Sequence, residues 1–322
     1  MTEVQSSRRD FLVQSAASLG VASLSQSLNV QSVSAADCTD TNQHPWIDAH
    51  SHIWTRDVEH YPLANEKTVD DLDPASFTTE ELLKVAHQNN VGRVVLIAHN
   101  VYYRWDNSYM IDAARQHPHA FRIVGMVDNM EPHPDLAMKK LLSQKVTGFR
   151  ITPGVYGREK WLENPGMHAM WKMAAETRQN MCCLINPEDL PVIDAWCRTY
   201  PETPVVIDHF ARIGIDGEIR KSDLDNLCKL SSHKHVTVKI SAYYALGQKK
   251  PPHTELVPMI ARLIDAFGVE RLMWASDSPY QIVGENTYHD SIQLITERMD
   301  ALSANDREWL LRKTAEKVFY FV

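Results

Sequence analysis

The feature that most constrains the fold is the alternation, after residue 43, between short apolar runs and longer segments with helical periodicity. Eight of these runs are rich in Val and Ile and are bounded by Gly, Pro, Asp or Asn, which is typical of strands. Several lack polar alternation, as in residues 94–98, and such runs are expected in a parallel sheet buried on both faces. The predicted strands are residues 46–50, 93–98, 122–127, 146–151, 181–186, 204–209, 236–241 and 271–276.

Helical segments separate these runs and follow the last one. We expect helices at residues 79–88, 107–116, 134–143, 167–179, 188–200, 222–231, 254–267, 291–302 and 305–318. Strands and helices that alternate in this way imply βαβ units and a parallel sheet, and eight units favour closure into a barrel. The sequence therefore predicts an α/β fold, a TIM-like (β/α)8 barrel that occupies residues 44–322 as a single domain. The irregular residues 53–73 are expected to cover the barrel mouth.

The N-terminal segment, residues 1–36, has the pattern of an export signal. Arg8 and Arg9 precede an apolar and small-residue stretch over residues 11–28, and the small residues at 33–36 provide a cleavage site. An arginine pair in this place resembles the bacterial twin-arginine signal, which implies a periplasmic or extracellular protein. The alternative is an amphipathic N-terminal helix with a chance arginine pair.

Composition and charge limit the kinds of partner that we expect for this chain. The formal net charge is -8, and no basic run follows the N-terminus, which argues against a nucleic-acid partner. Gln14, Ser15 and Ser18 interrupt the apolar N-terminal stretch, so we expect no stable membrane span there. A homo-oligomer stays open, because nothing in the sequence decides the oligomeric state.

The motif at residues 48–52, Asp-Ala-His-Ser-His, ends the first predicted strand. Because side chains alternate along a strand, Asp48, His50 and His52 are expected to share one face. If that face is inward, the two imidazoles meet at the carboxyl end of the barrel, where barrel enzymes place their chemistry. Two histidines at this spacing can hold one metal ion. The alternative is a pair of hydrogen-bonded surface histidines.

Three further strand ends supply candidate partners. Arg150 suits a carboxylate or a polarised carbonyl, because its guanidinium donates two parallel hydrogen bonds; otherwise it makes a surface salt bridge. His209 can stabilise an oxyanion, bind metal or transfer a proton, or can be structural. Asp277 can bind metal and accept a proton from water, or can cap a helix.

Aromatic residues on the loops are candidates for the pocket walls. Trp54 and Tyr61 lie on the loop after the first strand, and Tyr102 lies after the second. Tyr244 is similarly placed after the seventh strand. Each is as compatible with loop packing as with substrate contact.

Together, these motifs resemble those of the amidohydrolase-related (amidohydrolase-2) family, from about residue 46 to the C-terminus. Residues 48–54, with Tyr61-Pro62, are similar to its sugar-lactonase and dicarboxylate-lactonase branch. The resemblance implies a metal or proton-transfer centre at His50, His52 and Asp277. It implies that His209 is an oxyanion partner or acid/base, and that Arg150 is a substrate-binding cation.

Two departures from the family pattern bear on the metal. Metal-dependent relatives often have a histidine at the end of strand five, where this chain has Asn186, and an amide oxygen is a poorer ligand for zinc-like ions. Binuclear relatives use a modified lysine on strand four, where this chain has Arg150. We therefore expect one divalent metal, zinc before others, or a metal-free site.

The resemblance implies a hydrolase that opens a lactone of a sugar acid or dicarboxylate, with a small, carboxylate-bearing substrate. Asp277 would take the proton of the attacking water, His209 would stabilise the oxyanion, and Arg150 would bind the carboxylate. Two alternatives stay open: a metal-dependent non-oxidative decarboxylase, and an exported sugar-acid binding protein without catalysis.

Overall fold

The computed structural model describes residues 44–64, 66–156 and 164–322. The chain divides into two units, Met1–Asp37 and Cys38–Val322, and every described element belongs to the second. The export signal predicted over residues 1–36 lies outside the described residues.

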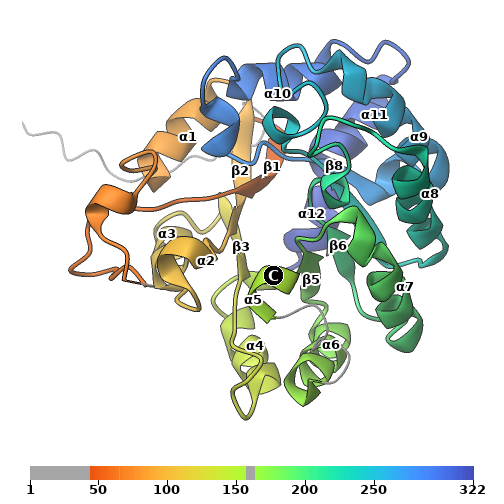
Figure 1. The fold of residues 1–322 in the computed structure, drawn as a ribbon. Helices are drawn as coiled ribbons and strands as arrows, with labels where there is room; N and C mark the ends of the chain where they lie inside the picture. Colours follow the sequence, from red (N-terminus) through yellow and green to blue (C-terminus); the bar gives the residue numbers. More distant parts are fainter. Residues whose placement is uncertain (1–43, 65, 157–163) are drawn as a thin grey trace, which may run out of the picture. The chain divides into compact units, whose positions relative to one another are not determined.

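Eight parallel strands form one sheet in the order in which they occur along the chain. The strands are β1 (Trp46–Ser51), β2 (Val91–Ile97), β3 (Phe121–Gly125), β4 (Val146–Ile151), β5 (Asn180–Cys183), β6 (Val205–Ile207), β7 (Val236–Ile240) and β8 (Leu272–Trp274). A parallel bridge from Ser51 to Ser278 and a hydrogen bond from Asp277 N to His50 O (2.8 Å) join the two ends of the sheet. The predicted TIM-like (β/α)8 barrel is confirmed, and Figure 1 shows its strands with helices around them.

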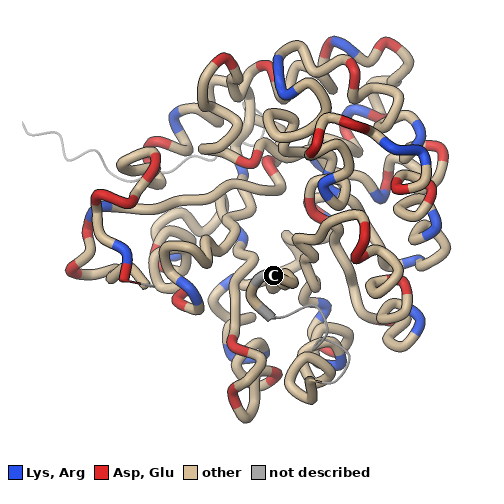
Figure 2. The backbone as a smooth tube through the Cα atoms, in the orientation of Figure 1, with Lys and Arg blue, Asp and Glu red and all other residues tan. Residues whose placement is uncertain are grey.

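The helices cover the outer face of the barrel. They are α1 (Thr79–His87), α2 (Asn100–Tyr103), α3 (Ser108–Gln116), α4 (Pro134–Leu142), α5 (Pro153–Tyr156), α6 (Pro165–Thr177), α7 (Leu190–Thr199), α8 (Lys221–Lys229), α9 (Val257–Phe267), α10 (Tyr288–Thr296), α11 (Ala304–Glu308) and α12 (Thr314–Phe319). Among the described residues, no helix combines the length and the apolar character that a membrane crossing would require. Acidic and basic residues are interspersed over the outer helices in Figure 2.

Several predicted boundaries were wrong, and a helix cap explains one of them. The helix expected at residues 291–302 starts earlier, at Tyr288, because the Thr287 side chain accepts a hydrogen bond from Asp290 N (3.0 Å) and caps it. The single helix expected at residues 305–318 is α11 and α12 joined by a π-helical turn, Trp309–Lys313.

The inside of the barrel is a small apolar cluster, separate from the larger core between strands and helices. Alternate strand residues supply it, as expected for a parallel barrel whose interior is packed with side chains. Phe319 of α12 packs against it. Its strand members include Ile47, Ala49, Val95, Ile97, Val124, Cys182, Val206 and Met273. The polar site lies beyond this apolar cluster, at the carboxyl ends of the strands.

Candidate active site

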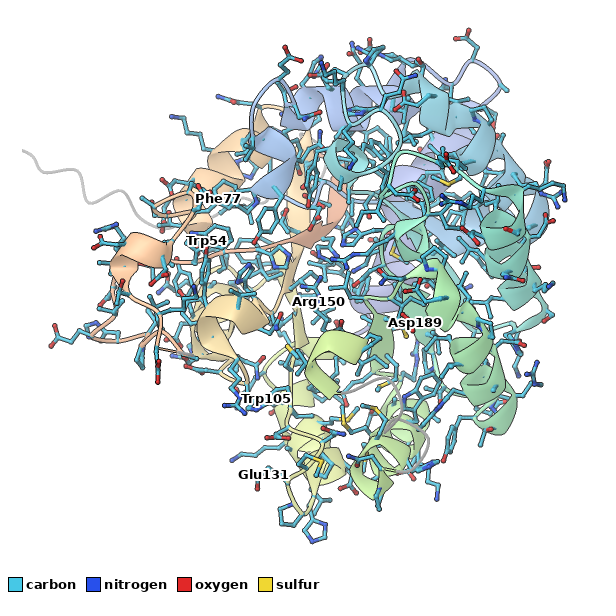
Figure 3. All side chains as sticks on the ribbon, viewed as in Figure 1. Trp54, Phe77, Trp105, Glu131, Arg150 and Asp189 are labelled. Carbon is cyan, nitrogen blue, oxygen red and sulfur yellow. The ribbon has the colours of Figure 1, made fainter. Side chains whose placement is uncertain are left out.

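The predicted site residues meet at the carboxyl ends of the strands. His50 lies in β1 with His52 just after it, Arg150 lies in β4, His209 follows β6 and Asp277 follows β8. All five side chains are buried. Figure 3 labels Arg150 near the centre of the ring of strand ends.

Asp277 is the residue on which the other site residues converge. Its Oδ1 atom lies 3.3 Å from His50 Nε2 and 3.4 Å from His52 Nε2. Its Oδ2 atom lies 3.8 Å from His209 Nε2 and accepts a 2.8 Å hydrogen bond from the Tyr244 hydroxyl. The carboxylate is therefore held from one side by Tyr244 and surrounded on the other by imidazole nitrogens.

A cavity of about 310 Å³ opens beside this carboxylate. That volume is at the small end of the range for small-molecule sites. Cationic, imidazole and phenol groups border it together with a few apolar residues. The polar and aromatic members of its lining are His52, His99, Asn100, Arg150, His209, Arg212, Tyr244, Asp277 and Tyr280.

Asp48 does not share a face with His50, contrary to the expectation from strand alternation. The pairing of β1 with β2 shifts register between Asp48 and Ser51, so a bulge interrupts the alternation. Asp48 instead accepts hydrogen bonds from Ser276 Oγ (2.5 Å) and from the Tyr288 hydroxyl (2.9 Å), which lies on α10. Asp48 therefore connects the first strand to the segment that follows the last strand. These bonds lie next to the site residues His50 and Asp277.

The loops that carry the site have unusual backbone geometry. His209, Phe210, Ala211 and Arg212 have consecutive φ values of 52°, 54°, 53° and 58°, and Asp277 has 64°. Left-handed backbone disfavours residues other than glycine, and such residues normally occur singly. A left-handed turn at residues 209–212 brings both His209 and Arg212 to the lining of the cavity. Strain of this kind is characteristic of functional sites.

His50, His209 and Asp277 form a candidate metal site, since their ligand atoms lie within 4.8 Å of one another. Two imidazole nitrogens and a carboxylate oxygen suit a zinc-like ion. His50 Nε2 and Asp277 Oδ1 are buried and have no hydrogen-bond partner among the described residues, as expected of atoms directed at a ligand. Donor type and spacing therefore fit a metal. This set contains His209 where the predicted set has His52, whose Nε2 atom also lies 3.4 Å from Asp277 Oδ1.

The charge states follow from burial and neighbours. Burial lowers the pKa of His209 to about 4 and lowers that of His50 well below its usual value, so both imidazoles are neutral near pH 7. Burial alone would raise the pKa of Asp277, but the nearby imidazoles of His209, His52 and His50 outweigh it and lower that pKa. Asp277 is therefore ionised at neutral pH.

The end of β5 supplies no metal ligand among the described residues. Asn186 caps a short 3-10 helix, Pro187–Asp189, and its backbone N–H donates to Asp189 Oδ2 (3.1 Å). Leu184, not Asn186, reaches the lining of the cavity from this strand end. The strand itself stops at Cys183, earlier than predicted.

Of the loop aromatics considered for the pocket walls, Tyr244 lines the cavity, whereas Trp54, Tyr61 and Tyr102 do not. Trp54 is fully buried and donates from Nε1 to Pro74 O (2.8 Å). Its backbone forms an antiparallel bridge with Phe77, and Figure 3 labels both residues. The Tyr102 ring stacks on His99 at 4.3 Å. The Tyr61 hydroxyl donates to Asp112 Oδ2 (2.9 Å). The described part of the cavity lining includes none of these three aromatic residues.

Five site residues escaped prediction. Lys239 of β7 and Asp208, which follows β6, are fully buried beside His50 and form an ion pair at 3.1 Å. His99 and Tyr280 line the cavity and share a 2.5 Å hydrogen bond, and Arg212 lines it as a second cation. The sequence contained a signal for Lys239, which lies inside an apolar strand. A lysine is almost never buried unless it is paired, so a charged partner was to be expected.

Comparison with known proteins identifies the family of the chain. The profile of the family described as Amidohydrolase matches residues 47–321. The L-fucono-1,5-lactonase of Burkholderia ambifaria is 25% identical over 237 residues, which cover 72% of this chain and 80% of that protein. The 4-sulfomuconolactone hydrolase of Rhizobium radiobacter is 24% identical over 236 residues, which cover 72% and 75%.

A solved structure gives the same fold. It is a probable 2-pyrone-4,6-dicarboxylic acid hydrolase of Acinetobacter baumannii with citric acid bound, with a TM-score of 0.73 and 19% identity. The alignment covers 86% of this chain and 99% of that one.

Proposed function

The chain belongs to the amidohydrolase family, and from this premise we propose that it hydrolyses a lactone of a sugar acid or dicarboxylate. The observation that carries the proposal is the buried Asp277 carboxylate, which borders a small cavity together with Arg150 and His209. The two curated relatives, an L-fuconolactonase and a sulfomuconolactone hydrolase, support the same substrate class.

Asp277 accepts the proton of the attacking water. The Tyr244 hydroxyl occupies Oδ2, while Oδ1 accepts no hydrogen bond from the described residues and is available to a water molecule. A carboxylate with a lowered pKa is ionised but is a weak base, so it needs a water that is already acidified. A divalent metal at His50, His209 and Asp277, when bound, would lower the pKa of such a water.

In this mechanism His209 and Arg150 stabilise the charge that develops on the lactone carbonyl. His209 Nδ1 lies 2.8 Å from Ser241 Oγ, a hydroxyl that can donate or accept, so His209 can present either a proton or a lone pair at Nε2. Arg150 carries a fixed positive charge at the cavity, held by a bond from Nη1 to Ala98 O (3.3 Å). Fixed donors in a buried site are the largest single contribution to many acyl transfers.

The cavity favours a small anionic substrate. Arg150 and Arg212 both line it, and guanidinium groups bind carboxylates through paired hydrogen bonds. Tyr280 and Tyr244 provide aromatic surface between the polar groups. A five- or six-membered lactone that bears a carboxylate or several hydroxyls matches this chemistry.

A panel of sugar-acid lactones and dicarboxylate lactones, followed with a pH indicator, tests the proposal. A hydrolase releases one acid per ring opened, and we expect acid release from at least one class. Specific lactone binding without acid release would favour the alternative of a sugar-acid binding protein. Evolution of CO2 from an aromatic or unsaturated acid, with no lactone opened, would favour the decarboxylase.

A further inference from the structure

Lys239 is a buried charged side chain that the proposed mechanism leaves unused. It lies near the end of β7, is fully buried, and has its Nζ atom 5.3 Å from the Phe319 ring centroid. Its Nζ atom is 3.1 Å from Asp208 Oδ1 and 3.2 Å from His50 Nδ1. A buried ion pair is often no more stabilising than apolar residues of similar volume, so its place beside His50 calls for a functional reason.

The direction of the hydrogen bond between Lys239 and His50 is fixed by chemistry. An ammonium group has donors and no acceptor, so His50 Nδ1 must accept. A neutral imidazole carries one proton, and that proton is therefore on His50 Nε2, 3.3 Å from Asp277 Oδ1.

His52 has a different partner at the same ring atom. Its Nδ1 atom lies 2.8 Å from the Ile97 carbonyl oxygen, which can only accept, so Nδ1 of His52 carries a proton whereas Nδ1 of His50 carries none. A metal ion needs a lone pair on the ligating nitrogen, and the proton held on Nε2 of His50 occupies that position.

We propose that Lys239 is a positioning residue that weakens metal binding at His50, His209 and Asp277. It does so by keeping the proton on the ligating Nε2 of His50 and by placing a fixed positive charge behind that ring. Asp208 forms an ion pair with Lys239 and lies 3.6 Å from His50 Nδ1, farther from that atom than Lys239 Nζ. The inference concerns the metal affinity of the site and holds whichever ester the enzyme opens.

Replacing Lys239 by a neutral side chain of similar length should strengthen metal binding. In Lys239→Met, His50 Nδ1 loses its donor, and Asp208 becomes the acceptor for a proton on that atom. This is the carboxylate–histidine–metal arrangement, in which changes to the outer partner alter metal affinity by about 10-fold to 100-fold. We expect the Kd for Zn2+, measured by competition with a chromophoric chelator, to fall at least about 10-fold.

Two further variants isolate the effect. Lys234→Met removes a lysine that is 67% exposed at the entrance to the same strand, and should leave the Kd for Zn2+ unchanged. Lys239→Met combined with Asp208→Asn lacks the new carboxylate acceptor and should lose most of the gain. An unchanged or weaker Zn2+ affinity in folded Lys239→Met would overturn the proposal.

Nuclear magnetic resonance of the parent protein tests the tautomers without any change at Lys239. With 15N-labelled histidine, and with His50→Gln and His52→Gln used to assign the signals, the proton should be on Nε2 of His50 and on Nδ1 of His52. A proton on Nδ1 of His50 would contradict the proposal even if Lys239→Met failed to fold.

Discussion

Asp277 and the imidazoles around it define the chemistry at the scale of single residues. Burial keeps His209 and His50 neutral, while the imidazoles around Asp277 keep that carboxylate ionised. The same site therefore holds a negative charge and neutral hydrogen-bonding groups at pH 7. Asp277 and the imidazoles are therefore in these charge states before substrate binds, and no proton exchange with solvent is needed.

The pH dependence of kcat/KM should reflect this arrangement. Because the pKa of His209 is lowered to about 4, its neutral form persists as the pH falls through 6.5, where an exposed histidine would gain a proton. Asp277 also stays ionised over this range. We expect kcat/KM to be level between about pH 6 and 8 and to fall only near pH 4. An acid limb between pH 6 and 7, with tryptophan fluorescence showing an intact fold, would contradict the assignment.

Strand alternation predicted the positions of His50 and His52 well, but it misplaced Asp48. The bulge in β1 accompanies hydrogen bonds of Asp48 with Ser276 and Tyr288, which lie more than 200 positions away in the chain. No local pattern contains that information. Lys239, by contrast, was visible in the sequence as a lone charge in an apolar strand. Its pairing with Asp208 was not, because the two residues lie at the ends of different strands.

The left-handed turn His209–Arg212 is the element that most shapes the site. The predicted strand over residues 204–209 instead ends at Ile207, and the turn follows at once. Strands β5 and β8 also stop before their predicted ends. In each case burial extends further than the strand ladder, because residues of the turning segments, such as Ile185, Asp208 and Ala275, are also buried at the barrel mouth.

Ala211 provides a test of that turn. A left-handed conformation costs about 1–2 kcal/mol for a residue with a Cβ atom, and glycine avoids most of this cost. Ala114 is a matched control, because it is equally buried but lies in the right-handed helix α3. Chemical denaturation should therefore show Ala211→Gly to be more stable than Ala114→Gly by about 1–2 kcal/mol. Equal free energies of unfolding for the two variants would show that the backbone at Ala211 is not strained.

At the scale of the whole molecule, the sequence predicted the fold because the number of βαβ units is a global property. Eight apolar runs specify the barrel even where individual ends are misjudged by a few residues. The cavity was less predictable, because its lining comes from loops whose paths depend on packing. Trp54 and Tyr102 illustrate this, since both are on mouth loops and yet pack behind the lining.

Export is a further proposal at this scale. Residues 1–36 precede the region matched by the family profile, which begins at residue 47, and contain the arginine pair. Replacing Arg8 and Arg9 by lysine should block export by the twin-arginine route while preserving charge. We expect the unprocessed protein to accumulate in the cytoplasm of a bacterial host with that route. Unchanged periplasmic yield would argue against a twin-arginine signal.

In the proposed mechanism Asp277 activates water for lactone hydrolysis, and the turnover of Asp277→Asn tests this role most directly. The substitution keeps the shape of the side chain and removes its charge, while Asp216→Asn makes the same change at a residue with a half-exposed side chain outside the cavity lining. With the best lactone of the panel, we predict that kcat of Asp277→Asn falls by about 10³-fold or more, and that Asp216→Asn keeps the parent rate. Near-normal turnover in folded Asp277→Asn would contradict the account.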